Sequence, residues 1–264
     1  MKRVLVVRKF DDFSRILSEN DLSVINCATI ETVPLEDLSD LSAKLETIDN
    51  YDGIFLTSAA ATEIFRLKLR KIKRKIKLNF RGKIYVLGKR SFDLLKGENL
   101  DLVFDETANT AREMLEKISL EDVQGKRFLF VRGEKSLRIV PGFLSEIAAI
   151  EETIVYRTEN IPVEIDKINR IGEMLEKKEI VCSVFFSPSG AESFLEQFGT
   201  EILRQNKIAT IGKTTADFFE KQNLKVDFVA SKATAEDFAV ELIIFLGRKV
   251  ENSSRKYNKR HLTH

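Results

Sequence analysis

Several segments of this chain resemble other segments of the same chain, and one of them is out of order. Three pairs follow a common order: residues 55–65 with 184–194, 83–89 with 207–213, and 99–111 with 223–235. The fourth pair departs from it, because residues 126–132 match residues 2–8 at the amino terminus. Such self-similarity predicts an internal duplication of one structural unit. The displaced fourth segment predicts that one copy begins the chain, is interrupted, and resumes after the other copy.

The repeated segments belong to a regular alternation of two patterns. Short apolar runs rich in β-branched and aromatic residues predict strands at 4–7, 23–27, 53–56, 84–87, 102–104, 128–131, 154–156, 181–186, 208–211 and 226–229. Amphipathic stretches predict helices at 112–118, 137–148, 191–198, 214–221 and 235–246. Strand followed by helix, repeated, predicts parallel sheets with helices on both faces. The expected fold class is therefore α/β, with two parallel-sheet α/β/α domains related by internal duplication.

The permutation also predicts where the domains divide. One domain is expected to be discontinuous, from residues 1–33 and 162–247, and the other is an insertion at 37–157. The two crossings between them, at 28–33 and 153–158, are extended and β-branched in pattern. We expect them to form a two-stranded β hinge with a cleft beside it.

Composition limits the classes of function. The chain of 264 residues is 43% apolar and 32% charged, which is typical of a globular protein. Six Lys and Arg but one acidic residue lie in 248–264, so the net charge of +2 belongs to this tail, which is expected to be disordered. No apolar run approaches the roughly 20 residues that cross a bilayer. The start of the sequence has no signal-peptide pattern, so the expected location is cytoplasmic.

Histidine and cysteine are too few for several kinds of chemistry. The two histidines, His261 and His264, both lie in the tail, which argues against a Ser-His-Asp triad and against a histidine metal site. Cys27 and Cys182 lie in apolar stretches and are expected to be small buried residues rather than a disulfide or a zinc site. Carboxylates, Lys, Tyr and water remain as proton-transfer groups, and no metal is expected.

Two strand-to-helix turns are candidates for anion binding. Ser187, Ser189 and Gly190 follow a predicted strand and open a predicted helix, where backbone N–H groups are available to an anion. The alternative is an ordinary helix cap, and its repetition at Ser58 favours that alternative. In the second turn, residues 212–216, Thr214 or Thr215 is expected to cap the helix. This turn is not a P-loop, because Lys207 stands where that motif requires glycine.

Three further residues are candidates because of where their strands end. Tyr156 ends the predicted strand 154–156 of the second crossing, where a phenol can donate a proton or hydrogen bond to a ligand; a packed strand aromatic is the alternative. Arg8 and Arg132 end equivalent strands, at the edge where parallel sheets bind ligands. Each is either a partner for a substrate carboxylate or a member of a structural ion pair.

Taken together, these motifs resemble the uroporphyrinogen-III synthase family. The resemblance covers residues 1 to about 247, and residues 184–190, 209–216 and 154–156 carry it most specifically. It implies an enzyme without metal or organic cofactor that closes the linear tetrapyrrole hydroxymethylbilane, inverting ring D and losing water. It implies that the bilane loses its terminal hydroxyl and that a spiro intermediate then forms, fragments and recloses. The protein assists loss of the hydroxyl and folds an eight-carboxylate substrate.

The same resemblance implies roles for individual residues. Tyr156 is the expected proton donor to the leaving hydroxyl. The resemblance also implies that Ser187, Ser189, Gly190 and Thr215 bind substrate. With Arg8 and Arg132 from the strand ends, and with Ser58, Ser91 and Thr214 of the corresponding turns, they are the expected substrate-binding residues. The inserted domain departs from the family pattern, with Ser91 where Thr is commoner, Phe92 where a small residue is usual, and Ala59 in place of Pro or a polar residue. The expected state is a monomer, with possible transient contact with the preceding pathway enzyme.

Two other functions compete with this interpretation. A non-catalytic two-lobed protein that binds a small anion or regulates a partner would keep the same fold. Residues 66–83 hold ten Lys and Arg, which is one mark of nucleic-acid binding. Apolar residues interrupt them at helical spacing, so a solvated helix face explains most of the charge, and neither nucleic acid nor a membrane is expected as a partner.

Overall fold

The protein is described by a computed structural model over residues 2–74 and 80–248. Within these residues the chain divides into two compact units. The inserted unit runs from Thr32 to Glu159, and the discontinuous unit holds the described residues up to Glu31 and from Asn160 onward. The basic tail beyond Arg248 and part of the basic segment 66–83 lie outside the described residues.

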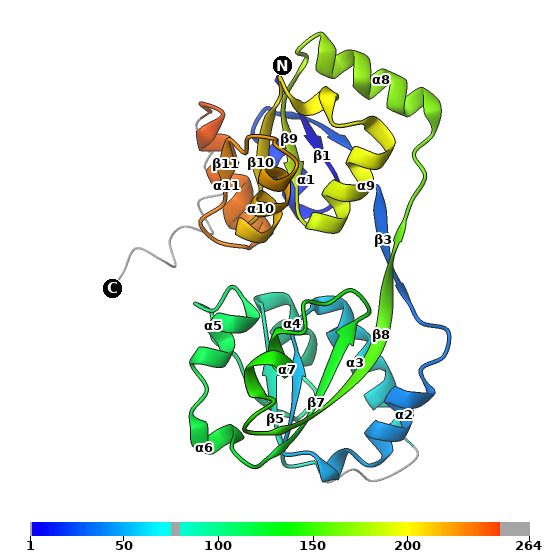
Figure 1. Ribbon diagram of the computed structural model, residues 1–264, viewed down its shortest axis with the longest axis vertical. Helices are drawn as coiled ribbons and strands as arrows, with labels where there is room; N and C mark the ends of the chain where they lie inside the picture. The colour runs from blue at the N-terminus through cyan, green and yellow to red at the C-terminus, as the bar shows by residue number, and fades with distance from the viewer. Residues whose placement is uncertain (1, 75–79, 249–264) are drawn as a thin grey trace. The chain divides into compact units, whose positions relative to one another are not determined.

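The discontinuous unit is a five-stranded sheet with helices on both faces (Figure 1). Its strands are β1 (Arg3–Val6), β2 (Ser23–Asn26), β9 (Ile180–Phe185), β10 (Lys207–Thr210) and β11 (Phe228–Val229). They lie in the order β11-β10-β9-β1-β2, and every pair is parallel. Its helices are α1 (Asp12–Ser18), α8 (Ile165–Glu176), α9 (Pro188–Phe198), η2 (Glu201–Leu203), α10 (Lys213–Lys221) and α11 (Ala235–Phe245).

The inserted unit is built around a sheet in the order β3-β8-β7-β4-β5-β6. The strands are β3 (Ile30–Pro34), β4 (Gly53–Leu56), β5 (Lys83–Val86), β6 (Asp101–Val103), β7 (Arg127–Gly133) and β8 (Ala149–Asn160). The pairs from β8 to β6 are parallel. The helices are α2 (Ser39–Glu46), η1 (Ile48–Asn50), α3 (Ala59–Lys73), α4 (Lys89–Leu95), α5 (Ala111–Glu116), α6 (Leu120–Val123) and α7 (Ile139–Leu144).

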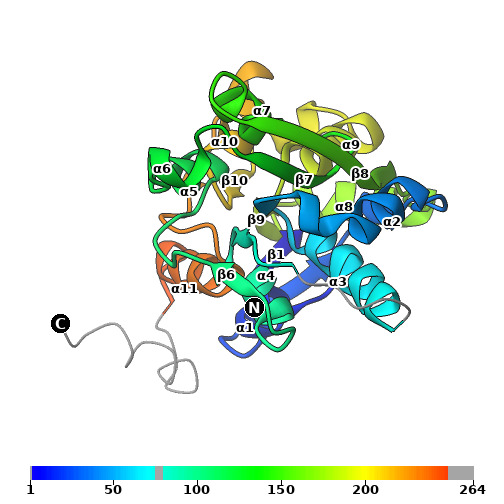
Figure 2. The same ribbon diagram turned by 90° about the horizontal axis from the view of Figure 1, so that it is seen from below.

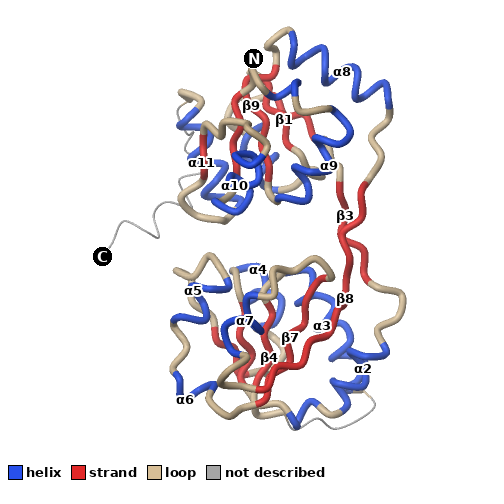
Figure 3. The backbone as a smooth tube through the Cα atoms, in the orientation of Figure 1, coloured by secondary structure: helices blue, strands red, loops and turns tan. Residues whose placement is uncertain are grey.

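Each sheet is covered on both faces because its central strands are apolar throughout. All four residues of β4 are buried, as expected of a parallel strand between two helix layers. In the inserted unit α2, α3 and α4 pack on one face and α5, α6 and α7 on the other; Figure 2 shows α2 beside α3. In the other unit α1 and α11 cover one face, and α8, α9 and α10 cover the second. Figure 3 shows α9 and α10 beside the strands of this sheet. Both units are therefore α/β/α layers around their own cores.

Segments of similar sequence take the same place in the two sheets. Strands β11, β10, β9, β1 and β2 of one unit correspond in order to β6, β5, β4, β7 and β8 of the other. The repeat at residues 2–8 thus lies on β1, beside β9, as its counterpart 126–132 on β7 lies beside β4. This common order supports the interpretation of an internal duplication.

Both crossings of the chain between the units run through paired strands. Thr32, where the inserted unit begins, is in β3, and Glu159, where it ends, is in β8. β3 and β8 are neighbours in one sheet. The Leu35 amide donates to the Val155 carbonyl at 3.0 Å, and the Ile161 amide donates to the Thr29 carbonyl at 2.7 Å. The inserted unit is therefore held at both of its ends by backbone pairing.

The α/β class with parallel sheets, predicted from the alternating pattern, is confirmed, but several elements differ from prediction. The helix expected at 137–148 is limited to Ile139–Leu144, because residues 149–160 form one long strand and 145–148 are the turn before it. Helices α2 and α8 were not predicted, and neither were the short helices α1, α4 and α6. These three short helices have four to seven residues, too few to show two turns of apolar periodicity.

Candidate active site

The carboxyl ends of the strands in the inserted unit bring several predicted residues to one edge of its sheet. Ser58 follows β4, Arg132 and Gly133 end β7, and Tyr156 lies on β8 beside them. The Tyr156 hydroxyl donates to Ser58 Oγ at 3.3 Å, and both side chains are partly buried. Ser58 also caps α3, since its Oγ accepts a hydrogen bond from the Ala61 amide at 3.2 Å. One serine oxygen therefore joins a phenol to the start of a helix.

Arg132 is held by carboxylates and carbonyls of its own unit. Its Nε donates to Glu152 Oε2 at 2.5 Å, and one of its terminal nitrogens donates to the carbonyls of Gly133 and Glu134 at 2.9 and 3.0 Å. Arg138 donates to the same Glu152 carboxylate. Burial opposes ionisation of Glu152, but the hydrogen bonds from Arg138 and Arg132 outweigh it and lower the pKa of the carboxyl below its ordinary value. Arg132 is thus a member of an ion pair in this structure, and its role toward a substrate carboxylate stays a prediction.

Ser91, a predicted substrate-binding residue, is buried. It is in the first turn of α4, and its side chain is 1% exposed. Gly88, which precedes this helix, has φ 83°, a value that a residue with a side chain rarely adopts. Phe92, the departure from the family pattern, stacks on Phe104 with ring centroids 4.8 Å apart. Ser91 and Phe92 thus face the core of the inserted unit, whereas Gly88, Lys89 and Arg90 of the same turn are exposed.

The turn 187–190 in the discontinuous unit is built as the sequence predicts. Ser187 is the N-cap of α9, with its Oγ accepting from the Gly190 amide at 3.1 Å, and Pro188 starts the helix. Ser189 Oγ lies 3.4 Å from Ser187 Oγ. Gly190 is buried, and its carbonyl accepts a hydrogen bond from Thr29 Oγ1 at 3.0 Å. The turn therefore ties the residues that lead into β3 to the start of α9.

The cap of α10 differs from prediction. Gly212, not Thr214 or Thr215, is the N-cap: its backbone is extended at φ −175° and ψ 170°, and its carbonyl accepts from the amides of Thr215 and Ala216. Both threonines are inside the first helical turn, where a residue no longer has the extended backbone that a cap needs. Thr214 is exposed, whereas Thr215 is 3% exposed.

Arg8 follows the carboxyl end of β1 and so lies at the same edge of its sheet as the turns before α9 and α10. Its guanidinium pairs with Asp11 at 2.9 Å and lies over the Phe186 ring, 4.2 Å from the centroid. About a third of the side chain stays exposed to solvent. Arg8 thus takes part in an ion pair, and its role toward a substrate carboxylate stays a prediction.

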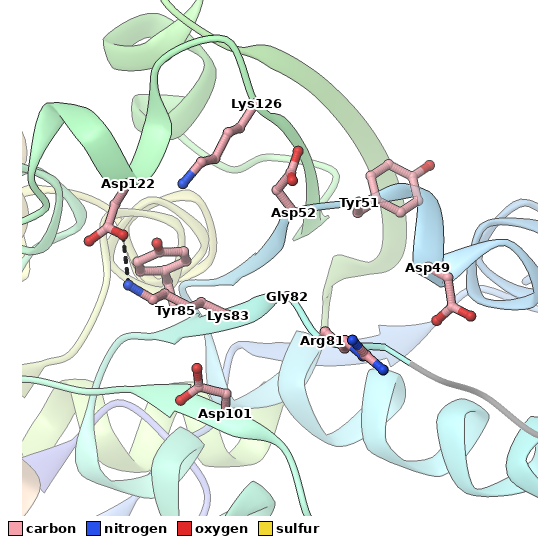
Figure 4. A pocket seen from close by; sticks show the side chains of 10 residues that line it. All are labelled: Asp49, Tyr51, Asp52, Arg81, Gly82, Lys83, Tyr85, Asp101, Asp122 and Lys126. Carbon is pink, nitrogen blue, oxygen red and sulfur yellow. Dashed lines mark hydrogen bonds and ion pairs between the residues drawn. The ribbon is translucent and has the colours of Figure 1, made fainter.

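Sequence reasoning missed a pocket of about 660 Å³ at the opposite edge of the inserted unit (Figure 4). The pocket lies at the amino-terminal ends of β4, β5 and β6. Its lining includes Asp52, Lys83, Asp101 and Lys126. Lys83 pairs with Asp122 at 2.7 Å, and this hydrogen bond lowers the pKa of the Asp122 carboxyl. None of the predicted site residues lines it. It could have been suspected only from charged residues that precede buried strands, a pattern common to many surfaces.

The cysteines and acidic residues of the described chain form no further centre. Cys27 and Cys182 are both free and fully buried, as predicted, and burial raises the pKa of the Cys182 thiol to about 12. Over residues 2–74 and 80–248, no three His, Cys, Asp or Glu side chains gather as metal ligands would. Over the same residues, every helix is too short or too polar to span a bilayer.

Comparison with known proteins places the chain in a family. The family model described as uroporphyrinogen-III synthase HemD matches residues 11–239. The chain belongs to the uroporphyrinogen-III synthase family. The family's match includes all the predicted site residues except Arg8.

Relatives of this family resemble the chain over most of its length. The uroporphyrinogen-III synthase of Chlorobaculum parvum is 29% identical over 245 residues, which are 90% of this chain and 97% of the relative. That of Schizosaccharomyces pombe is 26% identical over 94% of this chain and 93% of its own length.

Solved structures of family members share the fold. A mutant uroporphyrinogen III synthase from the extremely thermophilic bacterium Thermus thermophilus matches with a TM-score of 0.61 at 16% identity, covering 94% of this chain and 99% of that one. The Helicobacter pylori synthetase matches with a TM-score of 0.60 at 18% identity, covering 93% and 100%. At these identities the likeness concerns the fold.

Proposed function

We propose that this protein is a uroporphyrinogen-III synthase, a cyclising lyase that converts hydroxymethylbilane into uroporphyrinogen III with inversion of ring D and loss of water. The family match over residues 11–239 carries the proposal. The conversion serves haem and tetrapyrrole biosynthesis. A non-catalytic anion-binding protein is the less favoured alternative, because the curated relatives matched over nearly their whole length bear the enzyme's name.

In the proposed mechanism Tyr156 is the general acid. The C–O bond to the terminal hydroxyl breaks as the phenol transfers its proton to that oxygen, so water leaves and a protonated azafulvene cation remains. The substituted carbon of the last ring attacks the azafulvene carbon to give the spiro intermediate, which fragments and recloses with the ring inverted. Loss of a proton from the closed ring restores the pyrrole and balances the proton that Tyr156 donated. The contact with Ser58 at 3.3 Å supports a fixed position for the phenol.

The substrate's carboxylates are proposed to bind at the starts of helices. Ser187 and Ser58 cap α9 and α3, which leaves other amides of the first turn free of backbone acceptors within the helix. Amides at a helix start favour a negative charge. Ser189 and Gly190 are proposed to shape the start of α9 for acetate and propionate groups, and Thr214, Thr215 and Ser91 to do the same at the starts of α10 and α4. Arg8 and Arg132 are proposed to add positive charge at the same edges of the two sheets.

The decisive experiment supplies the purified protein with freshly prepared hydroxymethylbilane and separates the products after oxidation to porphyrins. Type III product from the native chain supports the proposal, whereas type I product alone, as formed without catalysis, overturns it. Tyr156→Phe is expected to lower kcat by about 10²-fold, the lower end of what a positioned general acid contributes. Tyr85→Phe is the matched control, because Tyr85 is 1% exposed and lines the pocket at the other edge of the sheet.

Location and assembly are further parts of the proposal. We propose that the protein works in the cytoplasm as a monomer and receives its substrate through transient contact with the enzyme that makes it. Neither an organic cofactor nor a metal is part of the proposed reaction, since acid catalysis and folding of the substrate account for its steps.

A further inference from the structure

We propose that Gly133 is a positioning residue for Tyr156: the absence of a side chain at 133 lets the phenol cross strand β7 and reach Ser58. The inference rests on the proposed function, in which Tyr156 donates the proton. Glycine is required at 133 because of the contact between Tyr156 and Ser58. Its small size explains how the phenol on β8 reaches the hydroxyl that follows β4, two strands away in the sheet.

The sheet order creates the need for this glycine. Tyr156 is on β8 and Ser58 follows β4, but β7 lies between these strands in the order β8-β7-β4. Neighbouring strands are about 4.8 Å apart, so the phenol must span a gap of roughly 10 Å. Its register partner on β7 is Gly133. The Tyr156 ring therefore crosses β7 at Gly133, the one residue of that strand without a side chain.

A bulge in β8 aims the ring in that direction. Arg132 pairs with Ile154 but Gly133 pairs with Tyr156, so Val155 is an extra residue on β8. In a regular strand Val155 and Tyr156 would face opposite sides of the sheet. Here Val155 is fully buried in the core under α3, and Tyr156 packs against that same core. Bulges turn side chains in this way and are common next to active sites.

The space at Gly133 is filled by the phenol itself. A Cβ built on Gly133 would lie 2.4 Å from Tyr156 Cζ, 2.5 Å from Cε2 and 2.8 Å from the hydroxyl oxygen. Carbon atoms in contact need about 3.5–4.0 Å. Gly133 is absent from the positive-φ glycines, so alanine fits its backbone. Because the atoms in conflict are the far end of one side chain, alanine is expected to displace the phenol and leave the strand in place.

The contact that would be lost has a chemical purpose in the proposed reaction. Ser58 Oγ accepts from the Ala61 amide and lies at the start of α3, a helix of 15 residues. Transfer of the Tyr156 proton leaves a phenolate, and both the Ser58 hydroxyl proton and the helix start favour that negative charge. A phenol moved by a substituent at 133 loses this stabilisation as well as its position.

The test compares Gly133→Ala with Gly142→Ala. Gly142 also has an ordinary φ, and a Cβ there meets nothing within 4 Å. Gly133→Ala is expected to lower kcat at least about 10-fold with KM changed less than about 3-fold, and Gly142→Ala to change neither, since a misplaced acid affects the chemical step. In the Tyr156→Phe background, Gly133→Ala is expected to cause no further loss. A further loss of about 10-fold in that background would show that Gly133 does not act through the phenol and would overturn the inference.

A second measurement reports on the ring without activity. In protein labelled with 3-fluorotyrosine, the ¹⁹F resonance that disappears in Tyr156→Phe belongs to Tyr156. It is expected to shift in Gly133→Ala and to stay in place in Gly142→Ala; an unchanged resonance overturns the inference. If the native protein formed no type III product, the proposed function would fail while this resonance still tested the geometry. If Gly133→Ala lost stability, adding Tyr156→Ala is expected to restore it, and no recovery would contradict the proposed contact.

Discussion

Glu152 joins two arginines at the edge of the inserted unit, and its side chain is 19% exposed. Because the pKa of this carboxyl is lowered in the folded protein, the unfolded chain binds its proton first as the pH falls. The stability that Glu152 contributes is therefore present above its ordinary pKa and is lost as the pH falls through the lowered value.

Glu152→Gln should make the free energy of unfolding depend less steeply on pH below about 4.5. At neutral pH the variant should lose about 2 kcal/mol, as is typical when a hydrogen bond to a charged group is lost. Urea unfolding at a series of pH values measures both quantities. Glu46→Gln, at an exposed position of α2, is the control and should keep the native slope. An equal slope in Glu152→Gln would show that this carboxyl does not contribute.

Single residues were predicted unevenly. Ser187 and Ser58 were singled out because a cap is defined by a few neighbouring residues, and both are caps. Gly133 was missed, since its importance depends on Tyr156, a residue distant in sequence that reaches it only through the bulge in β8. The partner of Arg132 was likewise left open, because an ion pair depends on which strand lies alongside.

At the scale of the element, α9 depends on its amino-terminal cap. Ser187→Ala removes the acceptor of the Gly190 amide and should destabilise the protein by about 1 kcal/mol. Ser189→Ala is the matched control, because Ser189 contacts the Ser187 hydroxyl at 3.4 Å and does not cap the helix. Thermal unfolding of both variants measures the difference. Equal stability of the two variants would argue against the capping role of Ser187.

Helix α10 shows the limit of predicting elements from residue preference. Threonine is favoured at the N-cap, yet Gly212 takes that place because β10 ends at Thr210 and the chain turns at once. The preference of Thr214 and Thr215 is local, whereas the point at which the helix begins depends on where the strand stops pairing.

At the scale of the whole molecule, each unit has its own core. The buried clusters under α2 to α7 contain residues of the inserted unit, and those beside α1 and α8 to α11 contain residues of the other. The ends of the inserted unit lie on the paired strands β3 and β8. A unit with a complete core and adjacent ends meets the conditions for independent folding.

A fragment of residues 32–159 should therefore fold alone and unfold cooperatively, as followed by circular dichroism. A fragment of residues 53–159 is the control. It lacks Leu41, Leu45 and Ile48, which are fully buried in that core, and should fail to form a stable fold. Similar unfolding curves for the two fragments would contradict the assignment of these residues to the core.

The sequence by itself determined the α/β class, the parallel sheets and the serine caps of α3 and α9, because these follow from the period of apolar residues and from local preferences. Its permuted repeats also predicted that one domain is interrupted by the other. Tertiary structure alone decided that Tyr156 meets Ser58 across Gly133 and that Arg132 pairs with Glu152. Those contacts depend on strand register, which one extra residue in β8 changes, and no local pattern in the sequence reports it.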